Sequence, residues 1–159
     1  MLGLEDRENV VIGTIPEPDL AEIDQVDFEA DKEKAVNNNS SVQNVRHSQA
    51  GTTAEISRKA DRETEAVGNA EADFLEAYQK LQAGRLEYQA ARDSYESARI
   101  SYDSLQKKRQ AGMVSQTEYL EGETAYLEAL TKRDCASMNL TQTLEDYRWM
   151  IKGTESARQ

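Results

Sequence analysis

Apolar and small residues recur every seven positions through the middle of this chain, and both series stop just before one glycine. The first series is aromatic and aliphatic, and the second is mostly small: Phe74, Leu81, Tyr88, Tyr95 and Tyr102, then Ala70, Ala77, Gly84, Ala91, Ala98 and Leu105. A strict seven-residue repeat keeps one seam of a helix facing a partner helix. We therefore predict one long helix from Glu63 to Gln110. Gly112 is expected to end it, because glycine is the residue favoured at the position just after a helix.

A second long helix is predicted directly after this glycine. Ser115 and Glu118 have the spacing of a capping box, in which each side chain bonds the other residue's backbone N–H. Apolar residues then recur at helical spacing from Gln116 to Lys152, where Gly153 supplies a second stop. Two long helices joined at residues 111–115 predict an all-α fold, an antiparallel coiled-coil hairpin whose apolar surface exceeds what one pair can bury.

Shorter elements are expected before the long repeat. A short helix is predicted from Asp27 to Val36, ended by three asparagines that favour turns. Ser40 or Ser41 is a suitable N-cap for a further helix, Ser41–Ser57. Two connections from this helix to the long helix stay open. One is a tight turn between Ser57 and Glu63, and the other is one uninterrupted helix from Ser41 to Ala111.

The two ends of the chain are predicted to be irregular. Residues 1–26 form an N-terminal arm, since Val10–Ile15 is β-branched and the two prolines that follow favour extended backbone. Residues 154–159 are expected to be a disordered tail. Trp149, the only tryptophan, is predicted to pack against Val10–Ile15. The helical part is therefore residues 27–153.

Composition supports a helical rod with a large wetted surface. The chain is 31% charged and 38% hydrophobic, with a mean hydropathy of −0.81. Its formal charge of −11 argues against nucleic-acid binding, which needs a basic surface. No apolar run is long enough for a transmembrane helix, and no basic-then-apolar signal peptide is expected in this chain. After Asp27 no ten-residue alternation predicts a strand of a β-barrel.

Candidate reactive residues lack the partners that catalysis needs. No phosphate-binding glycine loop, His–Glu zinc motif or Ser–His–Asp set is present, so we expect no enzyme activity, no cofactor and no metal. His47 lacks a second ligand at metal-binding spacing. Cys135 has no base nearby and is predicted to be a small packing residue. Tyr88, Tyr95 and Tyr102 are predicted to line the helix seam with their hydroxyls reaching water.

The segment from Lys107 to Ala129 resembles the hairpin tip of the TolC family of outer-membrane efflux proteins. It has a basic residue, small residues, Gly112 and a short turn, followed by acids, leucines and alanines at helical spacing. Leu144–Gly153 resembles the end of the family's repeat, and Asn37–Asn39 resembles its start. The resemblance covers about residues 20 to 153 and corresponds to one of the two repeats in family members.

This resemblance implies a subunit of an efflux duct. In that family three chains assemble into a tube of helical hairpins that acts as a passive conduit across the periplasm and the outer membrane. The strands that form the family's barrel have no counterpart here, so the chain resembles barrel-less relatives or a single-repeat fragment. The implied location is the cell envelope, and the implied partners are further copies of the chain and the periplasmic adaptor protein of an efflux pump.

The resemblance also implies two groups of site residues. The acidic ring that narrows the tube corresponds to Glu118 and Glu121, which would gate or select cations. The surface that contacts the adaptor corresponds to the tip residues: Arg109, Gly112, Met113, Val114 and Ser115. Arg109 stands where the family has a tyrosine, and Val114 stands where a basic residue ties neighbouring hairpins together.

Other readings stay open for these acids and for the chain. Glu118 and Glu121 are also the acids expected at a helix N-terminus, where they interact with the helix dipole. The whole chain is compatible with a non-transporting coiled-coil scaffold or adaptor of the cell envelope, or with a secreted helical effector. Self-association favours the duct, and a monomer favours the scaffold.

Overall fold

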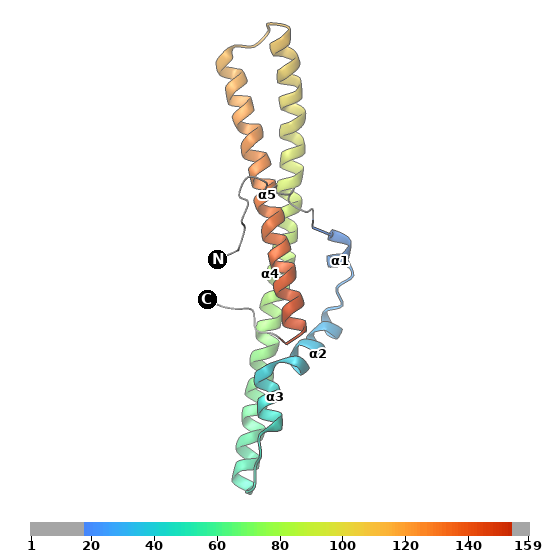
Figure 1. Cartoon of the computed structure of the whole chain (residues 1–159), viewed down its shortest axis with the longest axis vertical. Coiled ribbons are helices and arrows are strands. Elements are labelled where there is room, and N and C mark those ends of the chain that lie inside the picture. The colour runs from blue at the N-terminus through green and yellow to red at the C-terminus, as the bar shows by residue number, and fades with distance from the viewer. Residues whose placement is uncertain (1–17, 154–159) are drawn as a thin grey trace, which may run out of the picture.

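The computed structural model describes residues 18–153, which form five helices and no strand (Figure 1). The helices follow in the order α1 (Leu20–Asp24), α2 (Phe28–Asn38), α3 (Ser40–His47), α4 (Thr53–Gln110) and α5 (Gln116–Ile151). The all-α class predicted from the periodicity is therefore confirmed for the described residues. No helix in this part of the chain combines the length and apolarity needed to cross a membrane.

The longest element, α4, is the axis of the molecule. Its 58 residues give a helix about 87 Å long, at about 1.5 Å per residue. Phe74 pairs with Tyr147 at 5.6 Å between ring centroids, and Tyr102 pairs with Tyr119 at 5.9 Å. Helix α5 therefore runs back along the second half of α4, while α3 lies along the first half (Figure 1).

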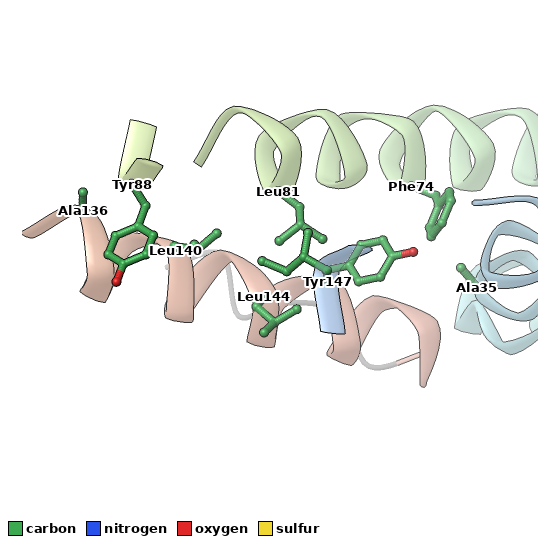
Figure 2. Packing of buried hydrophobic residues seen from close by; sticks show 9 residues of the cluster. Ala35, Phe74, Leu81, Tyr88, Ala136, Leu140, Leu144 and Tyr147 are labelled. Carbon is green, nitrogen blue, oxygen red and sulfur yellow. The ribbon is translucent and has the colours of Figure 1, made fainter. Parts of the chain in front are cut away.

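The core is the seam between α4 and α5. Phe74 and Leu81 of α4 and Leu140 of α5 have no exposed surface. Figure 2 shows these side chains directed toward one another from the two helices, with Tyr88 and Tyr147 in the same layer. Burial of each large apolar side chain contributes about 2 kcal/mol, so the seven-residue repeat identifies the residues that hold the rod together.

A strap formed by residues 18–38 crosses the end of the α4–α5 pair. Ile23 of α1 is 2% exposed and belongs to the same core cluster. Arg148 of α5 forms an ion pair with Glu22, with 2.9 Å between Nε and Oε1. The Tyr147 hydroxyl donates to Asp31 at 3.1 Å, and burial, followed by the nearby Asp31 carboxylate, raises the pKa of that hydroxyl.

The helix α1 corrects the prediction that residues 1–26 are irregular throughout. Asp19 is its N-cap, since Oδ1 accepts a hydrogen bond from the Ala21 N–H at 2.9 Å. Five residues are too few to form a stable helix alone. Burial of Ile23 against the rod stabilises α1, and this long-range contact is not visible in local sequence.

The boundary between α3 and α4 lies at residues 48–52, so the predicted turn between Ser57 and Glu63 is wrong. The uninterrupted helix from Ser41 to Ala111 is also wrong. Thr52 and Glu55 form a capping box at the start of α4, with the Thr52 N–H donating to Glu55 Oε2 at 3.0 Å. Ile56 is 58% exposed, so it does not continue a buried stripe across the boundary.

The caps of α2 and α3 also differ from expectation. Helix α2 starts after its N-cap Asp27, near the predicted start, but continues to Asn38. Asn39, rather than Ser40 or Ser41, is the N-cap of α3, because its side-chain oxygen accepts bonds from two backbone N–H groups. Asparagine therefore acts here as a cap shared by two consecutive helices.

The predicted end of the last helix is confirmed to within one residue. Helix α5 ends at Ile151, and Gly153 has a φ of +79°. A Cβ at Gly153 would lie 2.0 Å from the Asn38 carbonyl oxygen, so the chain passes very close to α2 there. The predicted contact of Val10–Ile15 with Trp149 and the predicted tail 154–159 lie outside the described residues.

Candidate functional site

The tip of the rod is the turn 111–115, hereafter the tip turn. Gly112 has a φ of +69°, in the left-handed region that favours glycine. The Gly112 N–H donates to the Arg109 carbonyl and the Met113 N–H donates to the Lys108 carbonyl, both at 2.9 Å. These two bonds form a Schellman motif, and they confirm that Gly112 ends the long helix.

The capping box predicted at the start of the last helix is confirmed. The Glu118 N–H donates to Ser115 Oγ at 3.2 Å, and the Ser115 N–H donates to Glu118 Oε2 at 2.9 Å. With one cap on each side, the tip turn has a defined backbone. Met113 projects from its apex and is 76% exposed, while Val114 is half-buried.

The two acids of the expected ring have different environments. The pKa of Glu118 is lowered, first by the hydrogen bond from the Ser115 backbone N–H, then by the Ser115 hydroxyl and by Lys108. This carboxylate therefore serves the cap of its own helix, as expected for an N-terminal acid. Glu121 lies about one turn further along α5, where it is exposed and takes no part in that cap.

Four tyrosines fill the seam between the tip and the aliphatic core, and we call them the tyrosine stack: Tyr95, Tyr102, Tyr119 and Tyr126. The rings of Tyr102 and Tyr126 are 4.9 Å apart and nearly parallel, with an interplanar angle of 10°. Tyr95 continues from Tyr126 at 5.8 Å, and Tyr119 continues from Tyr102 at 5.9 Å. The aromatic rings thus form one continuous column between α4 and α5.

An arginine covers each end of the tyrosine stack. The Arg109 guanidinium carbon lies 3.8 Å from the Tyr119 ring centroid, and that of Arg133 lies 4.2 Å from the Tyr95 ring centroid. Such cation–π contacts are favourable when the guanidinium lies over the ring face. Arg109, expected to contact an adaptor, is therefore engaged within its own chain.

The hydroxyl groups of the stack form a short network. The Tyr102 hydroxyl lies 2.7 Å from the Tyr119 hydroxyl and donates to Glu123 at 3.1 Å. The pKa of Tyr102 is raised, first by its hydrogen bond with Tyr119. The prediction that tyrosines line the seam is confirmed, but the Tyr102 hydroxyl bonds protein groups as well as facing solvent.

On the α5 side of the stack, Tyr126 and Arg133 were missed from sequence, whereas Tyr119 was expected among the apolar positions of the last helix. Tyr119, Tyr126 and Arg133 are themselves seven residues apart, so the same periodicity analysis applied to the second helix would have found them. Gly122 lies in the same seam, and a Cβ there would lie 2.2 Å from a methyl carbon of Leu105. Small residues therefore allow close packing of the helices near the tip.

A shallow groove of about 460 Å³ lies on α5 just beyond the tip turn, and we call it the tip groove. It is lined by residues of α5 alone: Thr117, Leu120, Glu121, Thr124, Ala125 and Glu128. Leu120 is 48% exposed. The groove combines an exposed apolar strip with two carboxylates on a surface that α4 does not cover.

A larger groove of about 900 Å³, the base groove, lies where α2, α3 and the end of α5 meet α4. Its lining includes a row of alanines on α4: Ala66, Ala70 and Ala77. Charged residues of both signs, such as Arg62 and Asp73, also line it. Two cations and four carboxylates line it, so the surface is net acidic: Arg62 and Lys80, then Glu65, Asp73, Glu76 and Asp146.

His47 and Cys135 are the remaining candidate residues. His47 Nδ1 lies 2.7 Å from the Gln43 carbonyl oxygen within α3. Cys135 is exposed, so the prediction that it packs in the core is wrong. It falls on the outer side of α5, next to the buried Ala136. Among residues 18–153 no group of three or more His, Cys, Asp or Glu could hold a metal ion.

Comparison with known proteins gives no match. No model of a protein family matches the chain, and neither a curated protein nor a solved structure matches it.

Proposed function

We propose that this chain is a TolC-like subunit of an efflux duct, in which antiparallel coiled-coil hairpins from several copies pack side by side around a passive conduit. The observation that carries the proposal is the tip. A long helix ends at Gly112 in a Schellman motif, and the returning helix starts four residues later in a capping box. This fixed, narrow turn is suited to docking on another protein.

The proposed location is the cell envelope, and the proposed partners are two further copies and a periplasmic adaptor protein. In this proposal the adaptor contacts the tip turn through Met113, which is 76% exposed. Glu121 is the better candidate for a residue that meets passing cations, because its carboxylate is exposed. Glu118 contributes less, since its carboxylate accepts hydrogen bonds from Ser115.

The test is conductance in a planar lipid bilayer after reconstitution of the full chain. We expect cation-selective conductance that loses selectivity in Glu121→Gln and keeps most of it in Glu118→Gln. Glu65→Gln, an exposed carboxylate of α4 far from the tip, is the matched control. Conductance with unchanged selectivity in all three variants would reject the gate, and absence of conductance would reject the duct.

The second candidate is a non-transporting coiled-coil scaffold of the cell envelope. The engagement of Glu118 by Ser115 and of Arg109 by Tyr119 favours it, because both side chains satisfy contacts within one chain. A scaffold requires no lateral ring of hairpins. A monomer by light scattering at high concentration, with no conductance, is the result expected for this candidate.

A further inference from the structure

Opposite charges are separated onto the two helices near the tip. Between Glu96 and Ala111 the chain has four cationic residues and two carboxylates, and one of these cations, Arg99, pairs with Glu96. Between Gln116 and Thr131 it has four carboxylates and no cationic residue. Helix dipoles favour cations in the last turn of α4 and Glu118 in the first turn of α5. They do not account for Glu121 and Glu128, which lie beyond that turn.

Near the tip the charges of α4 form no ion pair with those of α5, although Arg99 pairs with Glu96 within α4. Among the described residues no ion pair joins α4 to α5. The tyrosine stack occupies the seam instead. Lys107, Glu121 and Glu128 are exposed, and their side chains have no hydrogen bond or ion pair with residues 18–153. Lys108 differs from these three residues, because its charge interacts with Glu118 and lowers the pKa of that carboxyl.

Exposed apolar side chains accompany both sets of charges. On α4, Ile100 is 62% exposed and lies seven residues before Lys107. These two residues follow Tyr95 and Tyr102 by five positions, which places them on the helix face opposite the seam. On α5, Leu120 lines the tip groove and is 48% exposed, and Leu127, seven residues later, is 50% exposed. On its outer face, α4 therefore presents Ile100 and Lys107, with the exposed carboxylate of Asp103 one turn before Lys107. The outer face of α5 presents exposed leucines with Glu121 and Glu128.

We propose that these two outer faces bind each other between copies of the chain. The α4 face of one copy, with Ile100 and Lys107, packs into the tip groove of the next copy, and Lys107 pairs with Glu121. The chain itself supplies both complementary surfaces, which favours a second copy over an unrelated partner. The contact is heterologous, so its repetition forms a ring if the rotation closes.

This contact specifies the lateral packing that the proposed duct requires, and it rests on that function for its biological setting. It also gives Glu121 a second role, as an interface residue. Because the whole chain carries a charge of −11, copies repel one another at long range. Local attraction at the tip therefore decides which faces meet, and it favours one register over others.

The test is the apparent dissociation constant of self-association, measured by sedimentation equilibrium on the full chain at low and high salt. We expect Lys107→Glu and Glu121→Lys each to weaken association by about tenfold, as for one charge pair at an interface. The double variant Lys107→Glu with Glu121→Lys restores it, because the pair is reformed with its signs exchanged. Arg58→Glu makes the same charge change at the far end of α4 and serves as the control.

Circular dichroism shows that each variant is folded before association is compared. A monomer at all concentrations overturns the proposal. An oligomer whose dissociation constant is the same in the wild type, the two single variants and the double variant also overturns it. Oligomers that obey the swap but give no bilayer conductance support this interface and reject the duct. Oligomers that conduct but ignore the swap support the duct and reject this interface.

Discussion

The hydroxyl groups of Tyr102 and Tyr119 lie 2.7 Å apart across the seam between α4 and α5. The two residues are 17 positions apart in sequence and lie on opposite sides of the tip turn. Their contact, extended to Glu123 at 3.1 Å, fixes the relative rotation of the two helices near the tip. An aliphatic seam would leave this rotation less specified, because apolar contacts have no direction.

Removal of the Tyr102 hydroxyl should destabilise the tip end of the rod. Tyr102→Phe keeps the ring in the stack but leaves Tyr119 and Glu123 without this partner, so we expect Tm to fall by about 1–3 °C. Tyr78→Phe is the control, since Tyr78 contacts Phe28 through its ring. Equal changes in the two variants, measured by thermal unfolding, would show that the hydroxyl network contributes nothing.

Three glycine-to-alanine variants should give different results. At Gly68, mid-helix with open space around a Cβ, alanine should stabilise by about 0.5–1 kcal/mol. At Gly112 the φ of +69° should make alanine destabilising by about 1 kcal/mol. Gly153→Ala should cost more, because its Cβ would meet the Asn38 backbone. Urea unfolding measures all three, and stabilisation at Gly112 would contradict the left-handed cap.

Acidification should remove the contribution of Glu118 to stability. The folded pKa of Glu118 lies below the ordinary value of 4.5, so the folded state favours the carboxylate. Its stabilisation is therefore complete above pH 4.5 and is lost as the pH falls through the folded pKa. The Tm difference between the wild type and Glu118→Gln should shrink between pH 7 and pH 3. A difference that is constant with pH would contradict this assignment.

Truncation of one core leucine and one surface leucine of α4 should show that the seam contributes to the free energy of unfolding and the outer face does not. Leu81→Ala removes a fully buried side chain and should cost about 2–5 kcal/mol. Leu86→Ala, at a position 66% exposed, should change the free energy of unfolding by less than about 0.5 kcal/mol. A large loss at Leu86 in the monomeric state would mean that this face is also buried.

The start of α4 can be tested by removing its N-cap, Thr52, and comparing the effect with a substitution at Asp61. Thr52→Ala should destabilise the chain by about 1 kcal/mol and speed amide exchange in residues 53–60. Asp61→Ala should have little effect, because Asp61 lies in the helix interior and is exposed. Destabilisation by Asp61→Ala with little effect of Thr52→Ala would contradict this boundary and would favour a turn between Ser57 and Glu63.

Periodicity alone was sufficient for the long elements and their seam. The repeat through Phe74 and Leu81 predicted the buried face of α4, and Gly112 with the Ser115–Glu118 spacing predicted the tip. These features are local or strictly periodic, so the residues that produce them can be recognised without a partner. Helix boundaries marked by weaker signals were less predictable. At the start of α4, the Thr52–Glu55 capping box was missed, and a turn was predicted between Ser57 and Glu63 instead.

Only the tertiary structure showed what lies against each periodic face. The short helix α1 depends on burial of Ile23, a contact with residues more than a hundred positions away. The tyrosine stack required the register of α5 against α4, which no spacing within one helix can give. The amino-acid sequence by itself determined two amphipathic helices and the turn between them, because those follow from backbone and periodicity. The three-dimensional packing decided which charges stay unpaired on the outside, because pairing depends on distances between segments that are remote in sequence.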